Sequence, residues 1–124
     1  MREEMKSYIQ VTTTTETKEL AEKIAYSLVE AKLAACVQIT GPITSIYRWR
    51  GKVENIQEWL CLIKTQDDLY NKVEATIKSL HPYETPEIIA VPIIKGSKEY
   101  LRWIDDGLEN FLLMITIALF MIIT

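Results

Sequence analysis

The sequence predicts an α+β domain with a ferredoxin-like βαββαβ topology, followed by a C-terminal helix. Stretches rich in β-branched residues alternate along the chain with stretches whose apolar residues recur at helical spacing. In addition, a short turn joins two strand-like stretches at the centre of the chain. Two βαβ units joined by a central hairpin form one antiparallel sheet with its helices on one face.

The first two elements are a strand and a helix. Tyr8–Thr14 alternates and is rich in β-branched residues, which predicts a strand. Over Glu16–Lys32, apolar residues recur every three or four positions, which predicts a helix with one apolar face. Thr15 is the expected N-cap, because a threonine hydroxyl can accept a bond from a backbone N–H of the first turn.

The centre of the chain predicts one long hairpin. Ala34–Ile39 has the pattern of a strand, which Gly41-Pro42 interrupts and Ile43–Trp49 resumes. Arg50-Gly51 is expected to form a two-residue turn. Lys52–Gln66 then returns as a single long strand.

This hairpin is too long for the rest of the sheet. A two-residue turn pairs Trp49 with Lys52 and Tyr47 with Glu54. A ribbon that carries Tyr47, Trp49 and Trp59 cannot bury both faces on its own small domain. Because exposed aromatic strands either aggregate or pair with another chain, we expect the protein to assemble with copies of itself.

The second half of the chain repeats the helix and strand pattern. Asp67–Leu80 predicts a helix, and the proline-stiffened connector HPYETPE leads from it into Ile88–Ile94. That strand looks buried, and it is expected at a sheet edge, where Pro92 is tolerated. Ser97–Glu109 predicts a third helix. Residues 1–110 therefore form a single domain.

Composition and missing motifs exclude several classes of function. The chain has 14 Lys and Arg against 17 Asp and Glu, a net charge of −3, which disfavours nucleic-acid binding. We find no nucleotide-binding glycine loop, HExxH or CxxC, and no recognisable nucleophile motif, so an enzyme is not expected. A 124-residue chain needs no metal to fold. Two cysteines and no export signal favour the cytoplasm.

Residues 111–124, FLLMITIALFMIIT, depart from this pattern. This uncharged tail is too short to span a bilayer, which takes roughly 20 apolar residues as a helix. Three interpretations are open: a segment packed on the oligomer, a weak membrane-surface anchor, or a product of read-through at the gene end. We favour the last, because nothing in the preceding fold requires the tail. Apart from the tail, no feature predicts a membrane partner.

Five sequence blocks carry a resemblance to a known family. They are LAAC, SIYRWRGKVE, LIKT, HPYETPEII and YLRWI, spread over about Tyr8 to Asn110. In this order and spacing they resemble the CutA-type divalent-cation tolerance proteins. The resemblance implies a ferredoxin-like homotrimer whose long hairpins reach neighbouring subunits. It also implies a role in tolerance to divalent metals, copper especially, and no established enzymatic activity.

By the same resemblance, Cys36 and His81 match positions tied to metal binding in some family members. Copper prefers thiolate and imidazole ligands, so weakly bound copper or another divalent cation is the expected cofactor. The further cysteines of those members are missing here, so either two subunits complete the site or His81 binds the metal weakly at the surface. The alternative is a buried Cys36 and a His81 hydrogen-bonded in a turn. We expect no disulfide, because the two-residue turn pairs Cys61 with Thr40, about 13 Å from Cys36.

The shared blocks also supply a candidate ligand cleft between subunits. Its candidate residues are Lys64, Glu84, Tyr83, Trp49, Tyr47 and Glu54. A lysine among carboxylates and rings could hold a small anionic or zwitterionic ligand, as in a non-enzymatic signalling or scaffold trimer. In the simpler interpretation Lys64 pairs with a carboxylate of another subunit, and the rings are interface anchors.

Overall fold

The computed structural model describes residues 7–109 and 118–123. A short 3₁₀ turn, Asp67–Leu69, precedes the second helix. The seven main elements, in chain order, are β1 (Tyr8–Thr15), α1 (Lys18–Glu30), β2 (Cys36–Trp49), β3 (Lys52–Gln66), α2 (Tyr70–Leu80), β4 (Ile88–Ile93) and α3 (Lys98–Asp106). This order confirms the predicted βαββαβ topology with its C-terminal helix.

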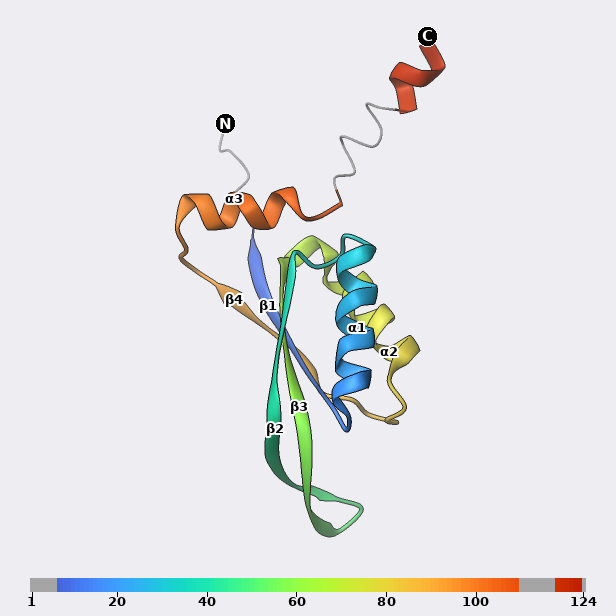
Figure 1. Ribbon diagram of the computed structural model, residues 1–124, viewed down its shortest axis with the longest axis vertical. Helices are drawn as coiled ribbons and strands as arrows, with labels where there is room; N and C mark the ends of the chain where they lie inside the picture. Colours follow the sequence, from blue (N-terminus) through green and yellow to red (C-terminus); the bar gives the residue numbers. More distant parts are fainter. Residues whose placement is uncertain (1–6, 110–117, 124) are drawn as a thin grey trace.

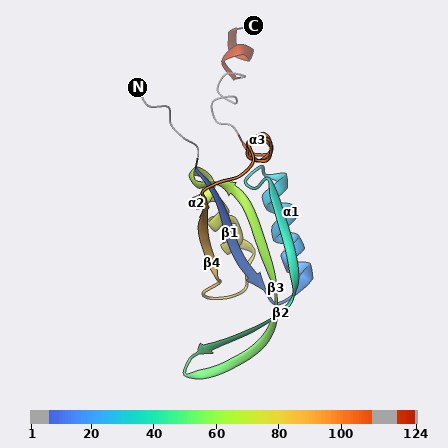
Figure 2. The ribbon, with the colours of Figure 1, turned by 90° about the vertical axis from the view of Figure 1, so that its left-hand side faces the viewer.

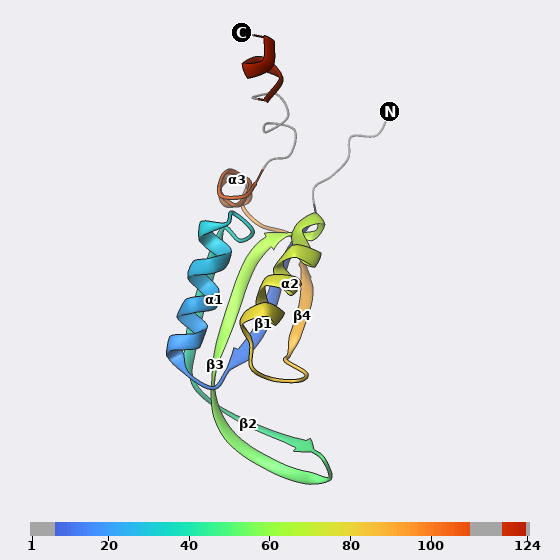
Figure 3. The ribbon, with the colours of Figure 1, turned by 90° about the vertical axis from the view of Figure 1, so that its right-hand side faces the viewer.

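The four strands form one antiparallel sheet in the order β2-β3-β1-β4. Helices α1 and α2 lie side by side on one face of this sheet, as the topology requires (Figure 1, Figure 3). The core fills the space between them, because the inward side chains of β1 and β3 meet the apolar stripes of both helices. Its fully buried members include Val11, Ile24, Leu28, Ile63, Val73 and Ile77.

Helix α1 begins later than the sequence predicted. Its N-cap is Thr17, whose hydroxyl oxygen accepts a bond from Leu20 N at 3.1 Å. The prediction of Thr15 was wrong, because β1 continues through this residue and pairs it with Trp59. The Thr15 hydroxyl instead donates to Thr17 O at 2.7 Å, which ties the end of the strand to the helix start.

The long hairpin has the predicted turn and the predicted pairing beside it. Arg50 and Gly51 both have positive φ, 50° and 80°, which is the geometry of a type I′ turn. Trp49 pairs with Lys52, and Tyr47 with Glu54. The half of the hairpin that carries the turn extends beyond the domain, at the end opposite α3, and bends under the α2–β4 connector (Figure 2, Figure 3).

The hairpin register shifts at Gly41-Pro42, between Thr40 and Ile43. Cys61 therefore pairs with Ile39 and not with Thr40, which corrects the predicted register. A bulge is a natural response to a proline that cannot donate to the ladder. Gly41 is needed there, because an added Cβ would lie 2.6 Å from Trp59 Cδ1.

Strand β4 lies at the sheet edge, as predicted, but it is not buried. Ile89 and Val91 are 54% and 48% exposed. Both stand on the face opposite the helices, where they pair with Thr12 and Gln10 of β1. The apolar run in the sequence indicated hydrophobicity correctly, but no described element of this chain covers that face.

Helix α3 crosses the end of the sheet and fastens it (Figure 1). Ser97 caps the helix by accepting from Tyr100 N at 3.1 Å. Asp105 accepts hydrogen bonds from Tyr8 Oη, at 2.9 Å, and from the Gln66 amide. These bonds link α3 to β1 and β3.

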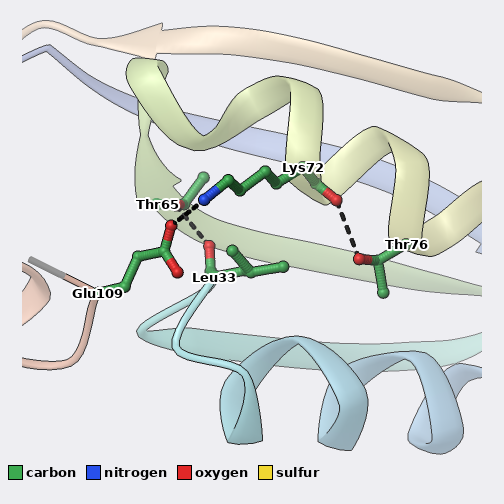
Figure 4. A network of polar contacts seen from close by, with 5 residues as sticks. All are labelled: Leu33, Thr65, Lys72, Thr76 and Glu109. Carbon is green, nitrogen blue, oxygen red and sulfur yellow. Dashed lines mark hydrogen bonds and ion pairs between the residues drawn. The ribbon is translucent and has the colours of Figure 1, made fainter. Parts of the chain in front are cut away.

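The segment that follows α3 returns to the helix layer. Glu109 N donates to Lys32 O at 2.8 Å. The Glu109 carboxylate lies 2.6 Å from Lys72 Nζ (Figure 4). In the same network Thr65 Oγ1 donates to Leu33 O at 2.7 Å. Residue 109 is therefore fixed against both the end of α1 and the start of α2.

Of the apolar tail, residues 111–117 and 124 lie outside the described residues. Residues 118–123 form a short helix with exposed side chains, among them Ile122 at 79% and Ile123 at 81%. Within the described part of the chain, no helix is long and apolar enough to cross a membrane. The three interpretations of the tail stay predictions.

Candidate functional site

A pocket of about 640 Å³ is lined by the segment after β1, by the half of the hairpin that carries the turn (the distal hairpin) and by the α2–β4 connector. Four carboxylates line it: Glu16 follows β1, Glu58 lies on β3, and Glu84 and Glu87 belong to the connector. Among the described residues, no lysine or arginine lines it. The pocket is therefore acidic; Glu16, Glu84 and Glu87 are exposed at its surface, and only Glu58 is buried.

Three aromatic side chains complete the wall of this acidic pocket. Tyr47 and Trp49 come from the distal part of β2, and Tyr83 comes from the connector. Tyr83 Oη donates to Glu58 Oε2 at 3.3 Å, which joins the connector to β3. Burial, followed by the charges of Glu16 and Glu58, raises the pKa of Tyr83 well above its ordinary value. The hydroxyl therefore stays a proton donor toward these carboxylates.

Arg50, at the hairpin turn, reaches the rim of the pocket. Its Nη2 lies 3.1 Å from Glu84 Oε2, and its guanidinium carbon lies 5.5 Å from the centre of the Trp49 ring. Both charged side chains of the pair are well exposed, so water screens their attraction. The contact nevertheless places a cation against a carboxylate and a ring at the edge of the pocket.

His81 caps α2 and is buried. Its Nε2 lies 2.7 Å from Thr14 O, a carbonyl that can only accept, so Nε2 carries the hydrogen. Its Nδ1 accepts from Tyr83 N at 3.2 Å. Both ring nitrogens are thus engaged in joining β1 to the connector, which is the hydrogen-bonded alternative considered for this residue.

Cys36 lies at the opposite end of the sheet from His81. It starts β2 and pairs with Lys64, whereas His81 bonds to Thr14, whose partner on β3 is Leu60. Four residues along a strand separate these positions by about 13 Å. One chain therefore does not bring Cys36 and His81 together. A site shared between subunits stays a prediction.

The two cysteines are free, as expected. Cys61 is fully buried, and burial raises the pKa of its thiol to about 11. Cys36 is half-buried. In the described ranges, 7–109 and 118–123, no group of three His, Cys, Asp or Glu side chains could hold a metal ion.

The structure gathers some of the predicted cleft residues and separates others. Tyr47, Trp49, Tyr83 and Glu84 line the acidic pocket. Glu54 pairs with Tyr47 across the hairpin but does not line the pocket. Lys64 lies further along β3, where its Nζ donates to Gln38 Oε1 at 2.8 Å. An inter-subunit cleft that includes Lys64 and Glu54 stays a prediction.

Sequence reasoning missed three of the four pocket glutamates, namely Glu16, Glu58 and Glu87. A signal was available only for Glu58, which is a charged residue at the start of the buried run WLCLI. Such a residue has either a partner or a function. Glu16 and Glu87 come from loops, and only the folded chain places them beside β3.

Comparison with known proteins agrees with this fold. A family model described as CutA1 divalent ion tolerance protein matches residues 9–107. The divalent-cation tolerance protein CutA of Thermus thermophilus is 49% identical over 94 residues, which cover 76% of this chain and 91% of that protein. Protein CutA of Mus musculus is 43% identical over 93 residues, which cover 75% of this chain and about half, 52%, of the mouse protein.

Solved structures of similar proteins have the same fold. The divalent cation tolerance protein Cut A1 from Thermus thermophilus superposes with a TM-score of 0.80 at 45% identity, covering 82% of this chain and 99% of that chain. CutA1 from Oryza sativa gives a TM-score of 0.82 at 38% identity, covering 84% and 95%. Sequence and structure together show that the chain belongs to the CutA1 divalent ion tolerance protein family.

Proposed function

We propose that this protein contributes to divalent-cation tolerance by binding divalent cations weakly in the acidic pocket of a homotrimer. The observation that carries the proposal is the set of four glutamates lining one pocket, with no lysine or arginine among the described lining residues. Relatives named divalent-cation tolerance proteins support the role. Each step of the proposal can be tested on the full chain.

The pocket fits a hydrated, loosely held ion better than a closed metal site. Carboxylates are ordinary ligands for divalent cations, but here no three of them converge on one point in the described residues. Glu58, Glu84 and Glu87 would attract the hydrated ion by their combined negative charge, without ligating it together. At a given site of this kind, Cu²⁺ binds more strongly than Zn²⁺, Ni²⁺ or Mn²⁺, so copper is the expected preference.

Calorimetric titration with Cu²⁺ and Mn²⁺ tests this site. Replacing Glu58, Glu84 and Glu87 together by Gln should weaken Cu²⁺ binding at least tenfold, because three charges are removed while side-chain volume is kept. The matched control replaces Glu19, Glu22 and Glu30 by Gln on the exposed face of α1 and should bind as the wild type does. Equal binding by all three proteins would reject the acidic pocket.

The same titration tests the residues identified by resemblance. If a site between subunits uses Cys36 and His81, Cys36→Ser and His81→Ala should each lower Cu²⁺ affinity. Copper prefers sulfur and nitrogen ligands, so a tight site would depend on these two residues. If these variants lose Cu²⁺ binding and the glutamate triple variant binds as the wild type does, the metal site is not the acidic pocket.

The homotrimer is proposed from uncovered apolar surface. On β4, Ile89 and Val91 are exposed on the face opposite the helices. On the distal hairpin, Ile46 and Val53 are 66% and 64% exposed. A monomer that leaves apolar side chains exposed at both places favours association, which buries them.

Light scattering on the purified full chain tests the assembly. We expect three chain masses at micromolar protein concentration. Val91→Lys should lower that mass, because it places a charge on the uncovered sheet face. Val29→Lys is the control: it changes an exposed valine on α1 and should leave the trimer intact. A monomeric wild type would reject the proposal.

The alternative function, a signalling or scaffold trimer with an anionic ligand, receives less support. The cation proposed for that ligand, Lys64, does not line the acidic pocket and bonds instead to Gln38. An anion would enter a pocket with four carboxylates at an electrostatic cost.

A further inference from the structure

The acidic pocket has features that a metal ion does not need. Its volume, about 640 Å³, is that of a small-molecule site, whereas a hydrated ion takes a fraction of it. Tyr47, Trp49 and Tyr83 give it aromatic walls. Rings beside carboxylates are the surroundings in which proteins bind organic cations, because the ring faces attract positive charge and exclude water.

Glu58 supplies an independent observation. Glu58 lines the pocket, and the residue as a whole is only 5% exposed. Among the described residues it forms no ion pair, and its one hydrogen bond is the 3.3 Å contact from Tyr83 Oη. A buried carboxylate is costly unless it is paired and well hydrogen-bonded. Within the described part of the chain, Glu58 therefore lacks a positive partner, on the side where the pocket opens.

The chain's own Arg50 indicates which cation fits. Its guanidinium already combines the two contacts available at the rim, a carboxylate at 3.1 Å from Glu84 and the Trp49 ring at 5.5 Å. A guanidinium is planar and weakly hydrated, so it stacks on rings and pairs with carboxylates better than an ammonium group does. Glu58 and Tyr83, which also line the pocket, repeat this combination of carboxylate and ring without a cation from the described residues.

We infer that the acidic pocket binds a small organic cation through a guanidinium head, which pairs with Glu58 between the aromatic walls while Arg50 competes for Glu84 at the rim. The metal proposal concerns the same pocket, but this inference does not depend on it. Binding of the organic cation requires no metal, so each can fail without the other.

The test uses the metal-free full chain, prepared with EDTA, and two isosteric probes. n-Butylguanidinium carries the charge, and n-butylurea has the same shape without it. Calorimetry should give saturable binding of n-butylguanidinium with a Kd of about 1 mM or tighter, which is reasonable for eight heavy atoms. n-Butylurea should bind at least tenfold more weakly, because it cannot pair with a buried carboxylate.

Three variants locate the probe. Glu58→Gln should lower n-butylguanidinium affinity roughly tenfold or more, since a charge-assisted bond is lost. Glu84→Gln, at an exposed position, should lower it less and keeps the conclusion testable if Glu58→Gln folds poorly. Arg50→Ala should raise affinity roughly two- to fivefold by removing the competing cation. Glu22→Gln on α1 is the control and should bind as the wild type does.

Several results would overturn the inference. No saturable binding of n-butylguanidinium, or equal binding of n-butylurea, would show that the pocket does not select a cation. Wild-type affinity in folded Glu58→Gln and Glu84→Gln proteins would place the probe elsewhere. A structure of the trimer in which a basic side chain of a neighbouring copy fills the pocket would also reject the inference, because Glu58 would then already have a positive partner.

Discussion

The two halves of the central hairpin are both antiparallel ladders, offset in register at Gly41-Pro42, but their environments are opposite. In the proximal half, next to the helices, Cys61, Ile63 and Thr65 of β3 are fully buried. In the distal half, from Ile43 to the turn and back to Glu58, only Glu58 is buried. The proximal half is thus part of the domain core, whereas the distal half is a ribbon that projects from it.

This difference shows that hydrogen bonding alone does not account for the stability of the distal half. An isolated two-stranded hairpin is marginally stable in water, so the distal half needs a good turn, contacts with the connector, or another chain. The acidic pocket is lined by the distal half and by the α2–β4 connector. Its residues are therefore held by a stable region on one side and by a weakly supported region on the other.

The largest expected effect distinguishes the two halves directly. Ile63→Ala in the proximal half should lower the free energy of unfolding by about 2–5 kcal/mol, because it opens a cavity in a packed core. Ile46→Ala in the distal half should change it by less than about 0.5 kcal/mol at dilutions where the chain is monomeric. Urea denaturation of both variants measures the difference.

Measuring both variants at several protein concentrations separates the contribution of assembly from that of the chain's own core. If trimers bury Ile46, the cost of Ile46→Ala should grow as the concentration rises and the assembly forms. The cost of Ile63→Ala in the chain's own core should be present throughout. Equal costs for both variants in the dilute monomer would contradict the division of the hairpin into core and ribbon.

The same division explains which features could be predicted from the sequence. Local patterns were sufficient for the order and type of the strands and helices and for the turn at Arg50-Gly51, because turn chemistry and periodicity act over short distances. They did not give the start of α1, which the continuation of β1 through Thr15 delays. The pairing of Cys61 was wrong because the bulge at Gly41-Pro42 shifts the register by an amount that no local pattern gives. The burial of Ile89 was wrong because hydrophobicity does not say what covers a strand.

The candidate site was harder to predict than the fold. Tyr47, Trp49, Tyr83 and Glu84 stood in recognisable blocks, but nothing local says that Lys64 points to another region or that Glu16 approaches Tyr83. These placements depend on the bend of the ribbon under the connector. They follow from tertiary structure, which composition and spacing do not record.

A smaller effect concerns the proximal half at high pH. Burial raises the pKa of the Cys61 thiol from its ordinary 9.0 to about 11. The folded protein thus holds this proton more tightly than the unfolded chain, and the resulting stability is complete below pH 9. As the pH rises from 9 to 11 the unfolded thiol ionises first, so up to about 2–3 kcal/mol is lost.

Cys61→Ala isolates this contribution to the pH dependence. The variant removes the titrating thiol, so its stability should fall less steeply than that of the wild type between pH 9 and 11, as measured by urea denaturation. Cys36→Ser is the control, because it removes the other thiol, which is only half-buried. Parallel curves of stability against pH for the wild type and Cys61→Ala would show that folding does not raise the pKa of this thiol.

The smallest effect concerns the tip of the distal half. Arg50 has a φ of 50°, a left-handed conformation that costs an arginine more than an asparagine. Asn-Gly is the preferred sequence for a type I′ turn, so Arg50→Asn should stabilise the turn by about 0.5–1 kcal/mol. The variant also loses the exposed pair with Glu84, which contributes about 0.2–1 kcal/mol.

A double-mutant cycle separates these opposing contributions of Arg50. In the Glu84→Gln background the pair is already absent, so Arg50→Asn should show its full stabilisation of the turn in urea denaturation. In the wild-type background the gain should be smaller or close to zero. A loss of more than about 1 kcal/mol in both backgrounds would mean that Arg50 holds the ribbon through contacts other than Glu84. The ribbon would then depend on that side chain for its position above the pocket, and its bend would not follow from the turn alone.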